Sequence, residues 1–312
     1  MSNVIVTGGA GFIGSHLVDR LIAEGHRVLV VDNLSTGDRR NVHPEAEVVE
    51  LDLLHPNLTD VCRSFRPEVV FHEAASVSVA QSMQRPDKDA ANNVTGTIYV
   101  LEACKASGAR KLVYASSAAV YGNPVSALVS ERHPIRPQSY YGISKYAPEQ
   151  YIRVAAETSG MDYTILRYSN VYGSRQGTRG EGGVVSIFAS RLRKGEPCVI
   201  FGDGQQTRDF VYVKDVVAAN IAALTQGGGR TINVSSCIPT SVNQLLRTMC
   251  GLLDKPFAPK YMSGRPGDIR DSLLDNGLAT TALDWRPSYS LREGLAEMLE
   301  EERARDGVTA DR

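Results

Sequence analysis

Short apolar runs rich in β-branched residues recur along the first half of the chain, and segments with helical spacing separate most of them. Apolar strands that alternate with helices are typical of βαβ units, in which helices cover both faces of a parallel sheet. The pattern therefore predicts an α/β fold with a doubly wound parallel sheet. The predicted strands are Val4–Thr7, Val28–Val31, Val48–Leu51, Val69–His72, Lys111–Ala115 and Thr164–Arg167, and the helical segments include Gly14–Glu24 and Ala91–Ser107.

The pattern changes after Tyr172, where a loop rich in Gly and Arg leads to short helices and loops that contain Pro and Gly. Such a change indicates a second, smaller unit. We expect residues 1–172 and 210–237 to form the first domain, and residues 173–209 and 238–312 to form a discontinuous α+β domain. Further expectations are helices at Val184–Lys194 and Leu291–Arg305, a strand edge and helix within Phe210–Gln226, and a frayed end at Gly307–Arg312.

The composition argues against several classes of protein. The 312 residues carry 34 Lys and Arg against 35 Asp and Glu, so the basic surplus of a typical nucleic-acid-binding protein is missing. Five cysteines without a CxxC pair argue against a disulfide framework or a zinc site, and we expect no metal. No apolar run approaches the roughly 20 residues that span a bilayer, and the N-terminus lacks a signal peptide's features. We therefore expect a soluble, cytoplasmic protein without nucleic-acid or membrane partners.

A glycine-rich turn follows the first predicted strand, with Gly8, Gly11 and Gly14 in the spacing G-x-x-G-x-x-G. Gly8 suits the tight turn from strand to helix, Gly11 allows the backbone to approach a pyrophosphate, and Gly14 allows the helix to pack closely on the sheet. The helix N-terminus offers free N–H groups and a positive dipole end to phosphate. Because the motif lies between a strand and a helix, it predicts a Rossmann-type dinucleotide site.

Asp32 ends the second predicted strand, about 20 residues beyond the glycine turn. A carboxylate at this place accepts hydrogen bonds from the ribose hydroxyls of the adenosine and repels a 2′-phosphate, which favours NAD over NADP. The alternative is that Asp32 only caps the next loop. Arg39 and Arg40 could grip a 2′-phosphate, but adjacent arginines more often form a solvated face.

Tyr141 and Lys145 are four residues apart, which places both side chains on one face of a helix. A phenol has a pKa near 10, and a nearby ammonium favours the phenolate, so the pair can act as a base. Such a pair also arises by chance in many chains. Ser117 strengthens the case, because it follows a predicted strand at the edge where α/β proteins bind ligands.

These residues together resemble the extended short-chain dehydrogenase/reductases, that is, the NAD-dependent epimerase/dehydratase family, and the likeness covers nearly the whole chain. Within that family the sequence is similar to the short bacterial UDP-glucose 4-epimerases. The resemblance implies that Ser117, Tyr141 and Lys145 are catalytic. It also implies NAD as the cofactor, with contacts from Gly8, Gly11, Phe12, Ile13, Gly14, Asp32, Asn33, Ser35, Thr36, Gly37, Asp52, Leu53, Ala74, Ala75, Asn93, Tyr141, Lys145 and Tyr168.

One departure from related families is informative. The sugar-nucleotide 4,6-dehydratases carry an Asp-Glu pair directly after the catalytic hydroxyl residue, and UDP-glucuronate decarboxylases carry a Glu at the second of these places. This chain has Ala118 and Ala119 there. Without these carboxylates, elimination and decarboxylation lack their proton carriers, whereas reversible hydride transfer at C4 does not need them.

The resemblance also implies a UDP-sugar as the substrate of the second domain. Arg208 and Arg265 would hold the diphosphate, since guanidinium groups suit phosphate oxygens, although each could equally be a solvated surface charge. Asp268 would bind the uridine ribose, and Ser272 stands where epimerases confined to plain hexoses carry a Tyr. The implied substrate contacts are Val77, Ser117, Asn170, Val184, Val199, Phe201, Arg208, Arg265, Asp268 and Ser272.

The expected activity is that of a UDP-hexose 4-epimerase acting on UDP-glucose and UDP-galactose, with UDP-N-acetylglucosamine as a further substrate. A homodimer is expected through helices near Asn92–Ser107 and Tyr141–Thr158, with apolar residues such as Val100, Leu101, Ile152 and Val154. Two alternatives stay open. A UDP-glucuronate 4-epimerase would need a cation near C6, for which Arg175 and Arg179 are candidates, and a non-catalytic NAD-sensing module would have no use for a base.

Overall fold

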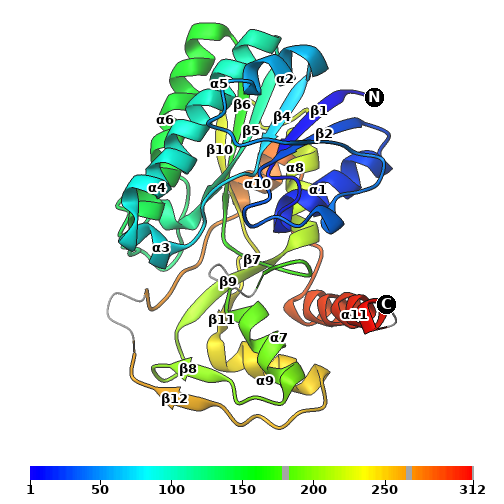
Figure 1. Cartoon of the computed structure of the whole chain (residues 1–312). Helices are drawn as coiled ribbons and strands as arrows, with labels where there is room; N and C mark the ends of the chain where they lie inside the picture. Colours follow the sequence, from blue (N-terminus) through cyan, green and yellow to red (C-terminus); the bar gives the residue numbers. More distant parts are fainter. Residues whose placement is uncertain (178–182, 265–268, 311–312) are drawn as a thin grey trace.

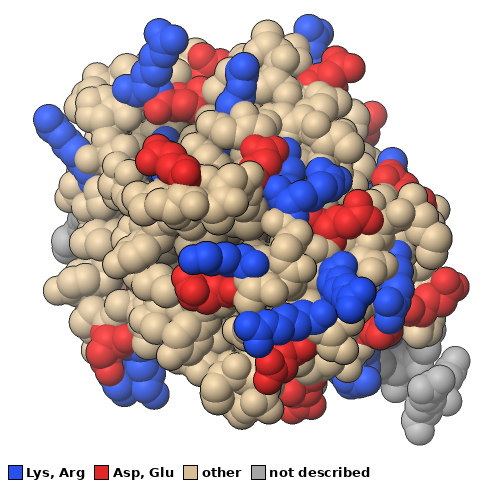
Figure 2. All heavy atoms as spheres, turned by 90° about the horizontal axis from the view of Figure 1, so that it is seen from above, with Lys and Arg blue, Asp and Glu red and all other residues tan. Residues whose placement is uncertain are grey.

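The computed structural model describes residues 1–177, 183–264 and 269–310, with side chains of the final helix described as far as Arg305. Figure 1 shows a larger part, in which helices cover a central sheet, and a smaller part built of short strands and helices. No helix in the described ranges is long and apolar enough to span a membrane. Figure 2 shows one face on which basic and acidic side chains are intermixed, in keeping with the balanced composition.

The central sheet has seven parallel strands in the order β10-β6-β5-β4-β1-β2-β3. The predicted α/β class is therefore confirmed. The order reverses between β1 and β4, and α/β folds bind ligands at such a switch point. The strands are β1 (Asn3–Thr7), β2 (Arg27–Asp32), β3 (Glu47–Glu50), β4 (Val69–His72), β5 (Lys111–Ser117), β6 (Asp162–Tyr168) and β10 (Arg230–Val234).

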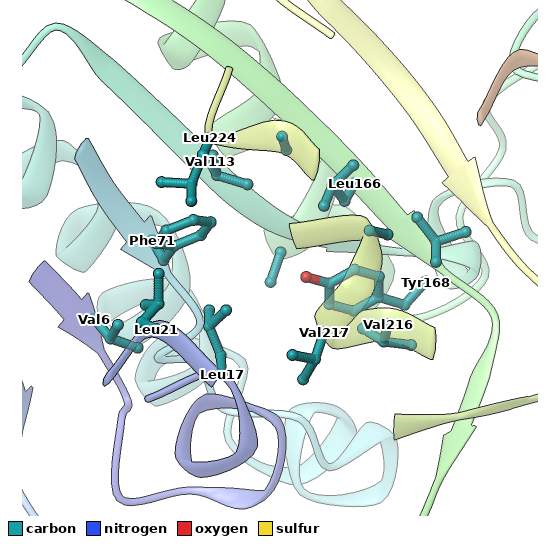
Figure 3. Close-up of a cluster of buried hydrophobic side chains, with 14 of the residues drawn as sticks. Val6, Leu17, Leu21, Phe71, Val113, Leu166, Tyr168, Val216, Val217 and Leu224 are labelled. Atoms are coloured by element: carbon teal, nitrogen blue, oxygen red, sulfur yellow. The ribbon is translucent and has the colours of Figure 1, made fainter. Parts of the chain in front are cut away.

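Two apolar clusters cover the two faces of this sheet, because successive side chains of a strand point to opposite faces. On one face Val6, Phe71 and Leu166 pack against Leu17 of helix α1 and Val216 of helix α8 (Figure 3). The other face is covered by a second cluster. The helices of the first face are α1 (Phe12–Ala23), α8 (Val213–Ala223) and α10 (Gly277–Leu283), and those of the second are α2 (Leu58–Phe65), α5 (Gly96–Ser107) and α6 (Tyr140–Ser159).

The smaller part has its own apolar cluster, to which α7, α9 and α11 contribute buried side chains. Two small sheets complete it, with the strand orders β11-β9-β7 and β12-β8. Its helices are α7 (Val184–Lys194), α9 (Val242–Leu252) and α11 (Leu291–Ala310). Its strands are β7 (Asn170–Tyr172), β8 (Val199–Phe201), β9 (Thr207–Tyr212), β11 (Pro239–Ser241) and β12 (Lys260–Met262).

Three local features differ from the sequence-based expectations. The helix expected over Ala91–Ser107 begins with a π-helical turn, Ala91–Thr95, before α5. The end expected to fray remains helical as far as Ala310. Trp285, which we assigned to the second domain, packs in the cluster of the large sheet and donates from Nε1 to the carbonyl oxygen of Asp215 at 2.9 Å. The exact division of the chain into domains stays a prediction.

The remaining short elements are α3 (Val79–Gln84), α4 (Pro86–Ala90) and the 3₁₀ turns Arg39–Asn41 and Ala118–Val120.

The outer faces of α5 and α6 expose a different apolar set from the one we expected. Val100, Leu101 and Ile152 are buried against the large sheet, so that part of the dimer prediction is wrong for these residues. Val154, the fourth, is 59% exposed. The spacing of apolar residues in the sequence indicated that both helices have apolar positions, but it did not indicate which of these positions face the sheet. Other exposed apolar side chains on these helices and on α3 are Val79, Met83, Tyr99, Tyr140, Ile143 and Tyr151.

Candidate active site

A cleft of about 420 Å³ lies at the carboxyl edge of the large sheet. Most of the predicted site residues line this cleft. They are Gly8, Gly11, Phe12, Ile13, Gly14, Asp32, Asn33, Ser35, Thr36, Gly37, Asp52, Leu53, Ala74, Ala75, Val77, Ser117, Tyr141, Lys145, Tyr168 and Asn170. Residues far apart in the sequence thus meet at the switch point of the sheet, where the topology favours a ligand.

The glycine turn forms a cradle that other residues would fill. Gly8 has a φ of +71°, and a Cβ at Gly14 would come within 2.2 Å of the Gly8 carbonyl oxygen. A Cβ at Gly11 would meet only that same oxygen within 4 Å, so the turn lies open to the cleft there. Gly11 is the N-cap of α1 and provides no side-chain cap. The N–H groups of the first turn are therefore available to a diphosphate, and the turn fits the dinucleotide.

The Asp32 carboxylate is fixed by the backbone at the end of β2. Its Oδ2 accepts a hydrogen bond from the Ala10 amide at 3.0 Å, and its Oδ1 accepts one from the Leu34 amide at 2.8 Å. Each oxygen retains a further lone pair for a ribose hydroxyl. Arg40, the candidate for a 2′-phosphate, is instead paired with Asp38, with Nη2 and Oδ2 2.5 Å apart. These contacts favour NAD.

Asn33 and Asp52 join two walls of the cleft beyond the ends of β2 and β3. The Asn33 Nδ2 atom donates to Oδ2 of Asp52 at 2.7 Å, and Oδ1 of Asp52 accepts from the Leu54 amide at 2.9 Å. The ends of β2 and β3 are thereby held together across this part of the wall.

Helix α6 brings Tyr141 to the cleft through its N-terminal contacts. The Ser139 hydroxyl caps the helix by accepting from the Gly142 amide at 3.1 Å, and the Tyr141 amide donates to the Ser82 hydroxyl at 3.1 Å. Gly142 allows close approach to the segment after Ser117, because a Cβ there would lie 2.6 Å from the Ala119 carbonyl oxygen. The first turn of α6 thus packs directly against the segment that follows β5.

Lys145 is buried and anchored to the same strand. Its Nζ atom donates to the Ala115 carbonyl oxygen at 2.6 Å and lies 5.1 Å from the centre of the Tyr114 ring. Burial lowers the pKa of Lys145 to about 8, while the negative charges of Glu73, Asp89 and Glu149 act in the opposite direction. The side chain therefore stays largely charged at neutral pH.

The two serines at the end of β5 have different partners. The Ser116 hydroxyl donates to Oε1 of Glu149 at 2.7 Å, and this carboxylate also receives two hydrogen bonds from Arg167, at 2.6 and 2.9 Å. Ser117 is half-buried, and its hydroxyl accepts from the Ala119 amide at 3.1 Å. Both border the cleft, but Ser117 retains its hydroxyl proton for a ligand.

His72, at the end of β4, has a tautomer that its neighbours determine. The Thr97 hydroxyl donates to the Asn93 carbonyl oxygen at 2.6 Å, so it must accept from Nε2 of His72, 2.9 Å away. Nδ1 of His72 then accepts from the Thr7 hydroxyl at 2.7 Å. The ring is neutral, and burial lowers its pKa to about 3, with Lys145 acting in the same direction. His72 supports the cleft floor and has no free ring nitrogen for a ligand.

Several predicted residues do not line this cleft. Asn93 is buried behind it and donates to the Ser76 carbonyl oxygen and to the Ser144 hydroxyl, both at 2.9 Å, so it supports the wall. The neighbour Gly183 lines the cleft where Val184 was expected to. Arg265 and Asp268 lie outside the described residues. Val199, Phe201, Arg208 and Ser272 lie in or beside the smaller part and do not border the cleft.

Two cations have local partners. Nη1 of Arg208 donates to the carbonyl oxygens of Thr207 at 2.7 Å and Arg270 at 3.2 Å. Arg175 is directed to α1, where Nη2 lies 2.7 Å from Oδ2 of Asp19. Arg175 was one of the two candidate cations for the alternative hexuronate substrate, and in the structure it pairs with Asp19 instead. Arg179 lies outside the described residues.

The polar residues that line the cleft but were not among the predicted site residues include Glu73 and Gln176. The Oε1 atom of Gln176 is buried and has no hydrogen-bond partner among the described residues. Glu73 could have been found, since it directly follows a buried strand whose end borders the predicted site. Within the described ranges no group of three or more His, Cys, Asp or Glu side chains could hold a metal ion.

Comparisons with known proteins agree with this geometry. The sequence model of the NAD dependent epimerase/dehydratase family matches residues 4–235. UDP-glucose 4-epimerase of Mycolicibacterium smegmatis is 42% identical over 303 residues, which cover 95% of this chain and 97% of that protein.

Two solved structures are also similar. The Thermotoga maritima UDP-glucose 4-epimerase with UDP-glucose is 42% identical, with a TM-score of 0.95 and coverage of 97% of this chain and 99% of that one. The Thermus thermophilus UDP-glucose 4-epimerase with NAD is 39% identical, with a TM-score of 0.91 and coverage of 96% and 99%.

Proposed function

The chain belongs to the NAD-dependent epimerase/dehydratase family, and on that premise we propose that it is a UDP-hexose 4-epimerase with NAD as its cofactor. The observation that carries this proposal is the wall on which Ser117, Tyr141 and Lys145 border one cleft with the glycine turn. Directly after Ser117 the chain has Ala118 and Ala119 and no carboxylate. The wall thus holds a base for a sugar hydroxyl without the acid pair that elimination needs.

The residues of this wall account for the proton transfer. Tyr141, as the phenolate that the Lys145 ammonium favours, takes the proton of the sugar 4-OH, while the Ser117 hydroxyl orients that oxygen. General-base help of this kind contributes about 10²–10⁴-fold in rate. NAD, which the glycine turn and Asp32 would hold, would supply the acceptor and the donor of the C4 hydride. When the 4-keto group is reduced, Tyr141 returns the proton to its oxygen.

Inversion at C4 requires the 4-keto sugar to turn over while its nucleotide stays bound. We propose that residues 1–172 and 210–237 hold NAD, and that residues 173–209 and 238–312 hold the uridine diphosphate. Arg208 and Arg265 would bind the diphosphate, Asp268 the uridine ribose, and the backbone at Val199 and Phe201 the uracil. A fixed diphosphate and a free sugar present opposite faces of C4 in turn.

The position of Arg175 favours a neutral hexose over a hexuronate. A 6-carboxylate needs a cation beside it, and Arg175, one of the two candidates, is already paired with Asp19, while Arg179 lies outside the described residues. A sensing module is disfavoured by the intact Ser117, Tyr141 and Lys145, since a sensor needs no base. UDP-glucose and UDP-galactose are therefore the proposed substrates.

We further propose that the sugar pocket accepts a 2-acetamido group. Ser272 is half-buried and stands where hexose-restricted epimerases, by resemblance, carry a Tyr. A hydroxymethyl group in place of an aromatic ring leaves room for several heavy atoms. UDP-N-acetylglucosamine should therefore be epimerised beside UDP-glucose.

A homodimer through α3, α5 and α6 is the proposed assembly. These helices pack on one another and expose Val79, Met83, Tyr99 and Val154, each at least 42% exposed. Contiguous apolar residues on a surface mark interaction sites. Two such faces placed against each other would bury these side chains and leave the cleft open.

The activity can be tested by incubating the purified protein with UDP-glucose, UDP-N-acetylglucosamine and UDP-glucuronate and resolving the 4-epimers by chromatography. We expect UDP-galactose and UDP-N-acetylgalactosamine without net NADH, because the hydride returns in each cycle. Stoichiometric NADH would identify a net dehydrogenase, and epimerisation of UDP-glucuronate alone would contradict the hexose assignment.

A further inference from the structure

Glu73 stands beside the diphosphate-binding turn and has no role in the mechanism above. It directly follows β4, and its amide donates to the Thr7 carbonyl oxygen at 3.2 Å. A Cβ at Gly8 would lie 3.0 Å from the carbonyl carbon of Glu73 and 2.6 Å from the Ala74 amide nitrogen. Glu73 also borders the cleft. The residue is therefore packed against the turn whose free N–H groups suit a diphosphate.

The Glu73 carboxyl group has one neutral hydrogen-bond partner. Its Oε1 accepts from the Tyr168 hydroxyl at 2.9 Å, and that hydroxyl receives a hydrogen bond from Nδ2 of Asn220 at 2.8 Å. No Lys, Arg or His of the described ranges lies within ion-pair distance of Glu73. Asp32, on the same cleft wall, contrasts with it because two backbone amides hold its carboxylate.

The charged groups on neighbouring elements do not offset the effect of burial on the pKa of Glu73. Burial raises its pKa to about 7, and the Tyr168 hydrogen bond and the charge of Lys145 on α6 only partly oppose this. His72, its neighbour on β4, is neutral. On α1 and α8 the titratable groups near this end have other partners. His16 contacts Ser174, Asp19 pairs with Arg175, Lys214 pairs with Glu301, and Asp215 accepts from Ser288.

We propose that Glu73 is a proton-linked part of the NAD site, and that the cleft takes up a proton on Glu73 when it binds the cofactor. A diphosphate on the glycine turn places negative charge near this carboxyl group, and a like charge disfavours the ionised form. The neutral acid also donates a hydrogen bond, which the carboxylate does not. The proposal concerns cofactor binding alone and does not depend on which sugar reacts.

The sign of the effect follows from linkage. Since NAD raises the pKa of Glu73 above its value of about 7 in the empty cleft, the complex holds more protons than the free protein between the two pKa values. The affinity for NAD is therefore highest below about pH 7, and it decreases as the pH rises toward the pKa of Glu73 in the complex. A shift of one unit in pKa corresponds to about a tenfold loss of affinity.

The test is calorimetric titration of the full chain, freed of bound cofactor, with NAD and separately with NADH. Titrations at pH 6.5 and 8.5 give the affinities, and titrations at pH 7.5 in phosphate and in Tris give the protons taken up. We expect about tenfold weaker binding at pH 8.5 and measurable proton uptake. In Glu73→Gln, which keeps an acceptor for Tyr168 but does not titrate, we expect less than about twofold change and a clear loss of uptake.

Two further variants separate Glu73 from other titrating groups. Glu131, whose Oε1 accepts from the Asn233 amide at 2.8 Å, is also a carboxyl group with a raised pKa, but it lies outside the cleft. Glu131→Gln should bind like the wild type at every pH. In Tyr168→Phe the lost hydrogen bond should move the midpoint of the pH dependence upward, because that bond lowers the pKa of Glu73.

The proposal is overturned if the wild type takes up no proton, or if Glu73→Gln keeps the uptake and pH dependence of the wild type. In the second case the titrating group would be another one, such as Lys145. If Glu73→Gln does not fold, as judged by circular dichroism, the Tyr168→Phe titration decides. A midpoint that stays in place or moves downward would then refute the assignment.

Discussion

The Nζ atom of Lys145 donates a hydrogen bond to the carbonyl oxygen of Ala115 at 2.6 Å, which ties helix α6 to β5 two residues before Ser117. The acceptor is a backbone atom of an interior strand of the large sheet, so the backbone of the sheet fixes the position of the ammonium. Tyr141 lies one turn earlier on the same helix. The register of α6 against β5 therefore sets the positions of the proposed base Tyr141, of Lys145 and of Ser117 together.

Replacing Lys145 by Met should move activity to alkaline pH. Without the ammonium, the Tyr141 phenol has to ionise at its ordinary pKa of about 10, which leaves about one molecule in a thousand as phenolate at pH 7. We expect kcat at pH 7 to fall by about 10²–10³-fold and to rise with pH up to about 10. A pH profile of UDP-galactose formation measures this.

Tyr141→Phe is the matched control for this profile. The phenyl ring keeps the packing but has no group to ionise, so turnover should be lost at every pH while UDP-sugar binding persists. An alkaline recovery in Tyr141→Phe, or a Lys145→Met profile parallel to that of the wild type, would show that another residue is the base.

The buried pair of Glu149 and Arg167 should dominate the stability of the wall. Both side chains are at most 3% exposed, and Nη2 and Oε2 are 2.6 Å apart. Glu149→Gln leaves the guanidinium without its counter-ion, and such losses cost about 3–5 kcal/mol. Urea unfolding at pH 7 measures the change in the free energy of unfolding.

Glu47→Gln provides the comparison, because Glu47 pairs with Arg27 at 2.7 Å with both side chains about half exposed. Exposed pairs contribute about 0–1 kcal/mol. Equal losses in the two variants would contradict the importance of the buried pair for stability.

The proposed dimer face should be sensitive to a charge at Val154. Val154→Glu places a carboxylate among the exposed apolar side chains of α6, where burying an unpaired charge in a dimer is costly. We expect a dimer for the wild type and a monomer for the variant in light scattering at micromolar concentration. Leu128→Glu, a change at a comparably exposed residue outside α3, α5 and α6, should leave the dimer intact. A monomeric wild type would refute the face.

Ser272→Tyr should separate the two proposed substrates. The ring would occupy the space of the 2-acetamido group, and a clash with a packed wall costs about 1–3 kcal/mol. The ratio of kcat/KM for UDP-N-acetylglucosamine to that for UDP-glucose should therefore fall by about 10–100-fold. Loss of both activities together, or of neither, would show that Ser272 does not control substrate size.

The large sheet was largely predictable from the sequence, because its buried strands are short β-branched runs. The run Val69–His72 has the same bounds in the structure, whereas β5 extends two residues beyond its prediction, to Ser117. Strand β10 was missed. It contains Asn233, whose polar side chain interrupts the apolar pattern. Hydrogen bonds with Tyr121 and Val129 compensate for the cost of burying this side chain. Such compensation depends on residues more than a hundred positions away.

The sequence predicted the candidate site best where a motif determines the backbone conformation. It predicted the site least well where the role of a charged side chain depends on which residue it pairs with. The glycine turn and the Tyr141–Lys145 spacing specify local geometry, so the structure could be anticipated there. From the sequence, Arg175 is a loop residue that could provide a cation to the sugar. In the structure its backbone has a φ of +66° and its side chain pairs with Asp19. Burial raises the pKa of Glu73, and the two residues that partly oppose this effect, Tyr168 and Lys145, are both far from it in the sequence.

The central claim, reversible hydride transfer at C4, is tested most directly with UDP-glucose carrying deuterium at C4. The hydride that leaves C4 returns to the same carbon within one cycle, so the UDP-galactose formed in ordinary water should retain the deuterium at C4, without accumulation of NADH. Mass spectrometry and proton NMR of the product measure the label. Replacement of the deuterium by solvent hydrogen would contradict the account, since it would mean that C4 inverts by proton exchange.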